Sequence, residues 1–372
     1  MNSLPRSWFL CVALLLSLAG PACAQPAFRS PEVSADGHIT FHLLAPKAQA
    51  VAVKGLRHLP PQAMTKDAKG VWSVTVGPLT PDLYSYTFDV DGATFTDPLN
   101  RRTKEWLANE SLVDVPGNPP LPLELTAVPH GTIHRHVFTS KARGGEVAVQ
   151  VYTPPGFDPK AATTYPVLYL LHGFGDEETA WVAAGHANFI ADNLLAKKLI
   201  VPAIIVMTNG HPVPIPAGDS RYDNYGPKNQ AAMEQELLHD VMPMIEAAYP
   251  VRTGAIDRAI VGLSMGGGQS LTIGLEHPEL FGWVGGFSSS APSGDLDQRF
   301  AALLAAEQAK AGAPRLIWVG VGKDDFLLEQ NTKFNAWLEA KKVPHEWHVT
   351  AGAHEWPVWR TYLEEYLQKI FR

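Results

Sequence analysis

A serine at position 264 stands in a segment whose residue types and spacing suit nucleophilic chemistry. The segment reads Gly-Leu-Ser-Met-Gly over residues 262–266, after a short apolar run that is typical of a buried parallel strand. The residues from Met265 to Glu276 are predicted to form a helix. Between strand and helix the turn is so tight that the serine takes a strained conformation and presents its hydroxyl. A Cβ at Gly262 or Gly266 would strike the neighbouring strand or helix. Ser264 is therefore the candidate nucleophile; the alternative is a glycine-rich turn with an incidental serine.

An acid that could assist Ser264 is expected later in the chain, because in this arrangement the order is serine, acid, histidine. The strand predicted at residues 316–320 is followed by Asp324 and Asp325, which would lie at its carboxyl end. Such a carboxylate holds the imidazole in its working tautomer and stabilises the imidazolium. We assign Asp325 this role and keep Asp324 as the alternative.

The histidine that would act as general base is expected just past the last strand. Of the histidines after Ser264, His354 lies in the loop 351–356, between the last predicted strand and the last predicted helix. His277, His345 and His348 lie at a helix end or in the last strand, where structural roles are expected. We therefore predict that His354 takes the proton from Ser264.

The oxyanion hole requires backbone N–H groups that point at the carbonyl oxygen as it gains charge. Met265, directly after the nucleophile, is expected to supply one of them, at the start of a helix whose dipole favours negative charge. The second is expected from Phe174, in the loop His-Gly-Phe-Gly-Asp at residues 172–176. His172 is expected to support this loop.

Residues 1–24 are predicted to be a signal peptide. Arg6 supplies the positive region, Trp8 to Leu18 the apolar region, and Ala-Cys-Ala at residues 22–24 the cleavage site. A lipoprotein that uses Cys23 is the alternative, although the preceding Gly-Pro fits a lipobox poorly. We expect a periplasmic or secreted protein that has no membrane segment after cleavage.

The mature chain would contain no cysteine, because Cys11 and Cys23 leave with the signal peptide. Disulfides, cysteine nucleophiles and cysteine metal sites are thereby excluded. The histidines are scattered and form no His-Glu-x-x-His pattern, so no metal and no other cofactor is expected. A formal net charge of −7 without basic runs argues against nucleic acid as a partner.

Residues 25–117 are predicted to form an all-β, immunoglobulin-like sandwich. Short β-rich runs separated by turn signals are expected to be strands at residues 39–44, 51–54, 71–76, 83–90 and 93–96. Asp-Gly at residues 91–92 predicts a type I′ hairpin. Because side chains alternate along a strand, Tyr84, Tyr86 and Phe88 share one face, which is either the sandwich core or a platform for sugar rings.

A proline-rich linker over residues 118–130 separates this module from an α/β domain over residues 131–372. The order of elements predicts an α/β-hydrolase fold with an antiparallel edge. Strands are expected at 133–138, 146–153, 166–171, 200–207, 259–261, 283–287, 316–320 and 346–349. Besides the helix after Ser264, helices are expected at 231–248, 296–311, 331–341 and 358–370.

Four blocks are similar to the corresponding blocks of feruloyl esterases and acetyl-xylan esterases. They are His-Gly-Phe-Gly-Asp at 172–176, Gly-Leu-Ser-Met-Gly-Gly at 262–267, Gly-Lys-Asp-Asp-Phe-Leu at 322–327 and Gly-Ala-His-Glu-Trp-Pro-Val-Trp at 352–359. These enzymes belong to the putative-esterase family (carbohydrate esterase family one), which also takes in esterase D and siderophore esterases. The resemblance runs from about residue 130 to 372, and the front module resembles the E-set module that often accompanies such enzymes.

The resemblance implies a secreted serine esterase that works by two-step acyl transfer. Within the family pattern the acid matches Asp325. Glu355 departs from the pattern, since the family often has a small polar residue after the histidine; this bears on the acyl pocket and the pH optimum. The implied partner is an acylated oligo- or polysaccharide, with carbohydrate contact by the front module as a further hypothesis.

Aromatic residues near the predicted site loops indicate the substrate. Trp181, Tyr222, Tyr225 and Trp356 are candidates for an aromatic acyl pocket, which favours feruloyl over acetyl esters, or else they are packing residues. The loop 209–230 is long enough to be a lid or substrate loop. Acetyl-xylan esterase, siderophore esterase and acyltransferase are the alternatives within the fold, and a non-catalytic carbohydrate-binding protein is the alternative from another class.

Overall fold

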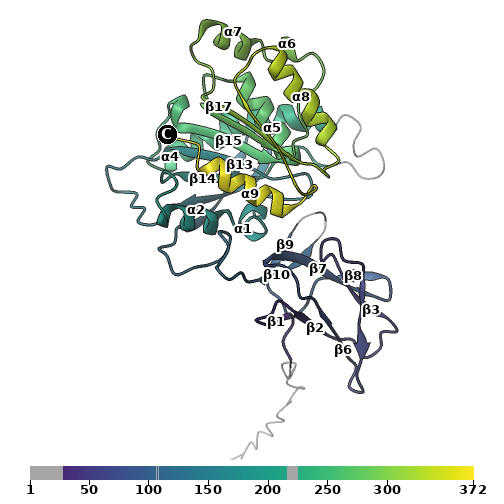
Figure 1. The fold of residues 1–372 in the computed structure, drawn as a ribbon. Helices are drawn as coiled ribbons and strands as arrows, with labels where there is room; N and C mark the ends of the chain where they lie inside the picture. Colours follow the sequence, from purple (N-terminus) through teal and green to yellow (C-terminus); the bar gives the residue numbers. More distant parts are fainter. Residues whose placement is uncertain (1–27, 106, 108, 216–224) are drawn as a thin grey trace, which may run out of the picture.

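A β-rich N-terminal module is joined to a larger α/β domain in the computed structural model (Figure 1). The structure describes residues 28–105, 107, 109–215 and 225–372. The predicted signal peptide with Cys11 and Cys23, Tyr222, and part of the predicted substrate loop lie outside the described residues. Within the described ranges, no helix has the length and apolar character needed to cross a membrane.

The N-terminal module is built from antiparallel sheets that face each other, as in an immunoglobulin-like sandwich. One sheet has the order β1-β2-β6-β5 and the other β4-β3-β7-β10-β9, with β8 paired to β7. Phe41, Trp72, Tyr86 and Phe88 are among the buried residues between them. The strands are β1 (Glu32–Val33), β2 (Ile39–Leu44), β3 (Val51–Lys54), β4 (Gln62–Ala63), β5 (Thr65–Lys66), β6 (Val71–Val76), β7 (Asp82–Val90), β8 (Ala93–Phe95), β9 (Thr103–Lys104) and β10 (Glu110–Val115).

The hairpin between β7 and β8 has the predicted geometry. Asp91 and Gly92 have φ angles of 51° and 88°, and a type I′ turn requires positive φ at both central residues.

The aromatic face of β7 belongs to the sandwich core, so the sugar-platform hypothesis for these rings is wrong. Tyr86 and Phe88 are fully buried, and Tyr84 is 4% exposed. Leu83 points to the other side of the strand and packs in the core of the α/β domain. The face of β7 opposite the sandwich core therefore meets the α/β domain.

Strand β10 went unpredicted because its burial does not alternate. Ser111, Leu112 and Val113 are consecutive and all buried. Val113 packs in the sandwich core, whereas Leu112 packs in the core of the α/β domain. A strand covered on both faces lacks the period-2 pattern by which a half-exposed strand is recognised.

The α/β domain is organised around an eight-stranded sheet of order β11-β12-β14-β13-β15-β16-β17-β18. β11, β12 and β14 pair antiparallel, and the remaining neighbours pair parallel. The central strand β13 is buried at all five residues, as expected when helices cover both faces. The strands are β11 (Thr132–Ser140), β12 (Gly145–Thr153), β13 (Val167–Leu171), β14 (Ile204–Thr208), β15 (Arg258–Leu263), β16 (Trp283–Phe287), β17 (Leu316–Gly322) and β18 (Glu346–Thr350).

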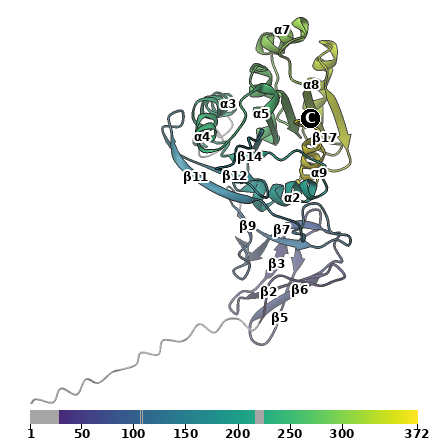
Figure 2. The ribbon, with the colours of Figure 1, turned by 90° about the vertical axis from the view of Figure 1, so that its left-hand side faces the viewer.

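Helices cover the two faces of this sheet as separate groups. The α/β-domain helices are α1 (Ala180–Ala183), α2 (Ala187–Ala196), α3 (Tyr225–Glu236), α4 (Met242–Ala248), α5 (Ser264–Glu276), α6 (Leu296–Arg299), α7 (Ala301–Ala309), α8 (Leu328–Ala340) and α9 (Trp356–Leu367). Residues of α1, α2 and α9 form one apolar cluster with Leu83 and Leu112 of the module, while α3, α4, α5, α7 and α8 contribute to the other. Accordingly, α2 and α9 lie on the side nearer the N-terminal module (Figures 1 and 2).

The helix predicted at 231–248 is longer and is interrupted. It begins at Tyr225, passes through a π-helical turn at Leu237–Val241 and continues as α4. Pro243 stands in the first turn of α4, and a proline cannot donate the backbone bond of a continuous α-helix. The π-helical turn accommodates the backbone hydrogen bond that Pro243 cannot donate.

The segment predicted as a linker, 118–130, contains no regular element and packs along α2. Asn193 Nδ2 donates to the carbonyl oxygens of Pro122 and Glu124, at 2.7 and 2.8 Å. His130 lies 2.9 Å from the Asp192 carboxylate. The segment thus follows the surface of the α/β domain between β10 and β11.

Candidate active site

Ser264 stands at the junction of β15 and α5 in a backbone conformation that non-glycine residues rarely adopt. Its φ is 53°. A Cβ on Gly262 would lie 2.6 Å from the backbone of Gly266, and one on Gly266 would lie 2.4 Å from the carbonyl oxygen of His172. The glycine spacing is thus required by the close approach of β13, β15 and α5, as the sequence predicted.

His354 lies between Ser264 and Asp325. Its Nε2 is 3.0 Å from Ser264 Oγ, and its Nδ1 is 2.9 Å from Asp325 Oδ2. The three residues come from the start of α5, the loop after β17 and the loop after β18. These segments lie at the carboxyl ends of β15, β17 and β18, three parallel strands of one sheet, and ligands bind at this edge of open α/β sheets.

The two neighbouring aspartates have different surroundings. Asp325 is 5% exposed, and its Oδ1 accepts the Leu327 N–H at 2.8 Å. Burial alone would raise the pKa of the Asp325 carboxyl, but hydrogen bonds from His354 and the Leu327 N–H help to hold it below its usual value. Asp324 is exposed and contributes only its backbone N–H, which donates to Gly352 O at 3.0 Å. The geometry pairs the histidine with Asp325.

Two aromatic rings flank the imidazole of His354. The Trp359 ring meets it edge-on at 5.0 Å, and the Phe326 ring lies 4.4 Å away. Phe326 is 75% exposed, although a ring of this size is ordinarily buried. Sequence reasoning did not single it out, because nothing in the sequence distinguishes an aromatic residue on a site rim from one in a core.

The loop 172–176, which carries the predicted oxyanion donor Phe174, is held by two buried histidines. The Gly210 N–H donates to His172 Nε2 at 2.8 Å, so the His172 Nδ1–H donates to Gly173 O, also at 2.8 Å. His211 Nε2 donates to Phe174 O at 2.9 Å, and its Nδ1 accepts from the Tyr225 hydroxyl. Both histidines therefore act in the neutral form.

Burial accounts for that neutral state. It lowers the pKa of His172 to about 4 and that of His211 to about 3. The sequence predicted the supporting role of His172, but it gave no signal for His211. That residue comes from the strand-end loop after β14 and reaches Phe174 only in the folded chain.

Two cavities meet at Ser264. One, of about 460 Å³, lies between the domains and is lined by Ser264, His354 and Trp356 together with Arg57, Tyr84 and Lys104 of the N-terminal module. The other, of about 740 Å³, is lined by Ser264, Met265 and Tyr225. Phe174 and Phe326 line both cavities. An ester bound at Ser264 would therefore have separate space for its acyl and alcohol parts.

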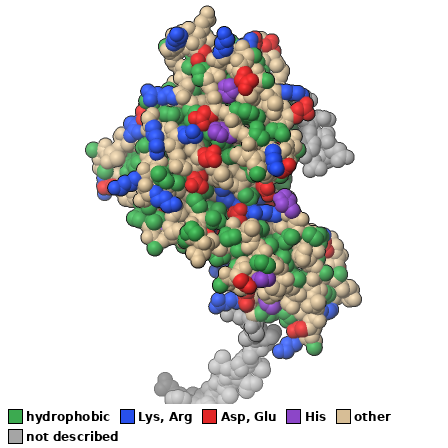
Figure 3. Space-filling view, viewed as in Figure 1, with side chains coloured by type: hydrophobic (Ala, Val, Ile, Leu, Met, Phe, Trp, Pro, Cys, Tyr) green, Lys and Arg blue, Asp and Glu red, His purple; other side chains and the backbone are tan. Residues whose placement is uncertain are grey.

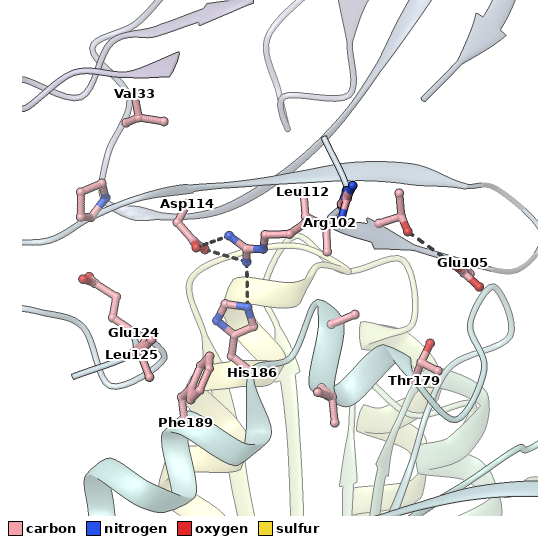
Figure 4. Close-up of a pocket in the computed structure, with 15 residues that line it drawn as sticks. Val33, Arg102, Glu105, Leu112, Asp114, Glu124, Leu125, Thr179, His186 and Phe189 are labelled. Atoms are coloured by element: carbon pink, nitrogen blue, oxygen red, sulfur yellow. Dashed lines mark hydrogen bonds and ion pairs between the residues drawn. The ribbon is translucent and has the colours of Figure 1, made fainter. Parts of the chain in front are cut away.

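A larger cavity of about 920 Å³ between the domains contains neither Ser264 nor His354. It is lined by Arg102, Asp114, His186 and Phe189, among others (Figure 4). Its size alone does not make it the candidate active site, because its lining includes none of Ser264, Asp325 and His354. In the described portion of the chain, no group of three or more His, Cys, Asp or Glu residues is arranged to hold a metal ion.

Of the predicted substrate-binding residues, Tyr225 and Trp356 line the cavities at Ser264 and Trp181 does not. Trp181 is 1% exposed, and its Nε1–H donates to Leu171 O at 3.0 Å. Its ring contacts Trp356 edge-on at 5.2 Å. Trp181 thus belongs to the core behind Trp356, because the one-turn helix α1 directs it toward the sheet.

Glu355, where the sequence departs from the family pattern, lines the cavity between the domains. Its Oε1 accepts the Ala353 N–H at 3.3 Å, and its Oε2 lies 3.8 Å from His58 of the module. The residue therefore faces the module across the cavity while leaving the His354 imidazole free to contact Ser264.

A sequence model of the family described as putative esterase matches residues 140–370. This range includes Ser264, Asp325 and His354. The chain belongs to that family of carboxylic ester hydrolases. Among curated proteins, this esterase is 31% identical over 355 residues to an endo-1,4-beta-xylanase/feruloyl esterase of Xylanibacter ruminicola. That match takes in 94% of this chain but 47% of the relative, so the esterase spans about half the length of that protein. It is also 20% identical to an acetyl esterase of Caldicellulosiruptor saccharolyticus, over 55% of this chain and 83% of that one.

Solved structures with the same fold include two esterases. The ferulic acid esterase AmCE1/Fae1A of Anaeromyces mucronatus superposes with a TM-score of 0.58 at 23% identity, over 67% of this chain and 93% of that one. The enterobactin esterase of Shigella flexneri superposes with a TM-score of 0.62 at 20% identity, over 89% of this chain and 92% of that one. At these identities the likeness concerns the fold.

Proposed function

We propose that this esterase is a secreted serine hydrolase that cleaves hydroxycinnamoyl esters, such as feruloyl esters, of plant cell-wall polysaccharide. The observation that carries the proposal is the hydrogen-bonded series Ser264–His354–Asp325, with the serine at the meeting point of two cavities. An N-terminal signal peptide over residues 1–24 would export the protein to the periplasm or beyond the cell.

The mechanism is two-step acyl transfer. Ser264 Oγ attacks the ester carbonyl while His354 Nε2 takes its proton, and the imidazolium is stabilised by Asp325. The N–H groups of Met265 and Phe174 stabilise the oxyanion. His354 then gives the proton to the leaving sugar hydroxyl. In the second step His354 activates water, which releases the acid and restores Ser264.

An aromatic acyl group is supported by the character of the cavity walls. Trp356 lines one cavity, Tyr225 lines the other, and the exposed ring of Phe326 lines both. Aromatic rings bind a planar phenolic acid by stacking or edge contacts, whereas an acetyl group would leave much of this surface uncovered. The named activity of the Xylanibacter ruminicola relative is consistent with this choice.

A substrate panel tests the choice of acyl group. Methyl ferulate and feruloylated arabinoxylan fragments are expected to be cleaved with a higher kcat/KM than acetylated xylan. A preference for acetylated xylan would make the protein an acetyl-xylan esterase. A preference for a catecholate trilactone would make it a siderophore esterase, the activity named for the Shigella flexneri structural neighbour, whose fold similarity extends over the N-terminal module.

The variant Ser264→Ala tests the mechanism. Its kcat on methyl ferulate is expected to fall on the order of a million-fold, because removal of a triad nucleophile leaves only binding and oxyanion stabilisation. The wild-type protein is expected to react with a fluorophosphonate probe and the variant is not. A wild-type protein that neither reacts with the probe nor cleaves any ester would instead be a non-catalytic carbohydrate-binding protein.

A further inference from the structure

A lysine of the N-terminal module reaches into the α/β domain beside the active site. Lys104, at the end of β9, places its Nζ 3.0 Å from Oδ1 of Asp176 and 3.5 Å from Oε2 of Glu110. The side chains of Lys104 and Asp176 are only 10% and 8% exposed. Burial alone would lower the pKa of the lysine, but the two carboxylates outweigh burial and raise it, so Lys104 is charged.

Asp176 belongs to the loop 172–176 that carries Phe174. Its N–H donates to Gly173 O at 3.2 Å, which closes a tight turn around Phe174. A Cβ built on Gly173 would lie 3.4 Å from Ser264 Cβ and 3.7 Å from Asp176 Oδ2. The carboxylate of Asp176 therefore lies close to the nucleophile, and both line the cavity between the domains.

A buried carboxylate at this place would oppose the reaction if it had no partner. While charged, it would repel the negative charge that develops on the carbonyl oxygen. Burial also raises the pKa of Asp176, so without a cation the group would tend to take up a proton. In either state the loop would lose the ion pair that holds it. Among the positively charged groups of the described residues, Lys104 is the one bonded to this carboxylate. The loop 172–176 thus belongs to the α/β domain, whereas the positive charge paired with Asp176 comes from Lys104 of the N-terminal module.

We infer that Lys104 is a positioning residue of the esterase reaction: its ion pair with Asp176 holds the loop of Phe174 in the geometry that stabilises the oxyanion. The inference rests on the proposed function, since it assigns a role within that same site. Under this inference the N-terminal module does two things: it lines part of the cavity at Ser264, and through Lys104 it helps to position an oxyanion donor.

The variant Lys104→Met tests the inference in the full-length protein, because methionine keeps most of the length but removes the charge. Its kcat on p-nitrophenyl acetate and on methyl ferulate is expected to fall about tenfold to a hundredfold, since a small displacement of an oxyanion donor costs about this much. Its KM is expected to stay within about threefold of wild type, because the loop contributes chiefly to the transition state. Lys104→Arg keeps the charge and is expected to recover most of the kcat.

Arg102→Met is the matched control. Arg102 also belongs to the module and also contacts the α/β domain, with its Nη2 3.1 Å from His186 Nε2, but that contact lies in the cavity that lacks Ser264 (Figure 4). Its kcat is expected to remain within about twofold of wild type. Titration of active sites with a fluorophosphonate gives kcat per reactive serine, so partial misfolding of a variant does not affect the comparison.

A Lys104→Met variant with the wild-type kcat would overturn the inference. An equal loss of kcat in Arg102→Met would also overturn it, because the loss would then reflect the docking of the two domains in general. Failure of the proposed function gives a different result, because ester cleavage would then survive in Ser264→Ala. p-Nitrophenyl acetate contains neither a sugar nor ferulate, so the inference can be tested whichever acyl group is the natural one.

Discussion

The Asp-Asp pair at residues 324–325 illustrates how burial separates two neighbouring side chains of identical chemistry. Asp325 is enclosed below His354 and accepts its Nδ1–H, while Asp324 extends into solvent. The hydroxyl, the imidazole and the buried carboxylate form one hydrogen-bonded series.

We expect Asp325→Asn to lower kcat by about 10⁴-fold, because an amide in place of the carboxylate favours the wrong imidazole tautomer. Asp324→Asn, one residue away, is expected to stay within about threefold of wild type. Steady-state kinetics on methyl ferulate checks both variants. Loss of activity in Asp324→Asn with activity kept in Asp325→Asn would reassign the acid.

At the scale of elements, the site depends on how closely α5 approaches the ends of β13 and β15. Gly262 and Gly266 let the first turn of α5 pack directly on these strands, and that packing holds Ser264 at a φ of 53°. The strained backbone conformation of Ser264 is maintained because the surrounding strands are packed too closely for the turn to relax.

We expect Gly266→Ala to lower the free energy of unfolding by about 3 kcal/mol, since its Cβ would lie 2.4 Å from the His172 carbonyl oxygen. kcat is expected to fall as well, because α5 must move away from β13. Gly145→Ala in β12 is the control: a Cβ there meets no atom within 4 Å, and the unfolding free energy is expected to change by less than about 1 kcal/mol. Urea denaturation of the two variants measures the difference. Equal stability of the two variants would contradict the steric argument.

At the scale of the whole molecule, the two domains share a core and an ion-pair network. Leu83 and Leu112 pack with the helices of the α/β domain. Asp82 of β7 pairs with Arg57 of its own module and with Arg360 of α9, which is 4% exposed. Elsewhere on the surface drawn in Figure 3, acidic and basic side chains are interspersed over both domains. The ion pairs of Asp82 thus lie where the two domains meet.

Stability of the whole protein is expected to depend on pH through its buried histidines, and the contribution of His172 can be tested separately. Its pKa is about 4 in the folded protein against an ordinary 6.5, so between these values the unfolded chain binds a proton that the folded chain does not. The folded state therefore loses stability as the pH falls from 6.5 toward 4, by about 3 kcal/mol for this one group.

Urea denaturation at pH 7 and at pH 4 measures that loss. A His172→Gln variant, which cannot titrate but keeps hydrogen-bonding atoms, is expected to lose about 3 kcal/mol less than wild type over the same interval. An identical pH dependence of the two proteins would show that His172 is not the group responsible.

The local pattern was sufficient to predict the strands of the α/β domain in order, and several of its helices. β13, β15 and β16 are short apolar runs bounded by turn residues, and their type depends on neighbours in the sequence. The same pattern placed Ser264, the pair Asp324 and Asp325, and His354 in the segments that follow parallel strands, but it left Asp324 as an alternative to Asp325. Strand β10 and helix α2 were missed, since both derive their burial from contacts across the molecule.

What the sequence by itself determined is the set of local requirements: the tight turn at Ser264, the hairpin at Asp91 and the chain order of the candidate residues Ser264, Asp325 and His354. Only the tertiary structure decided that Trp181 is packing, that Phe326 is exposed on the rim and that His211 and Lys104 reach the loop of Phe174. The physical reason is the separation along the sequence of the residues that interact. A turn or a strand is specified by residues within a few positions, whereas a buried ion pair between residues 104 and 176 forms only when two domains come together.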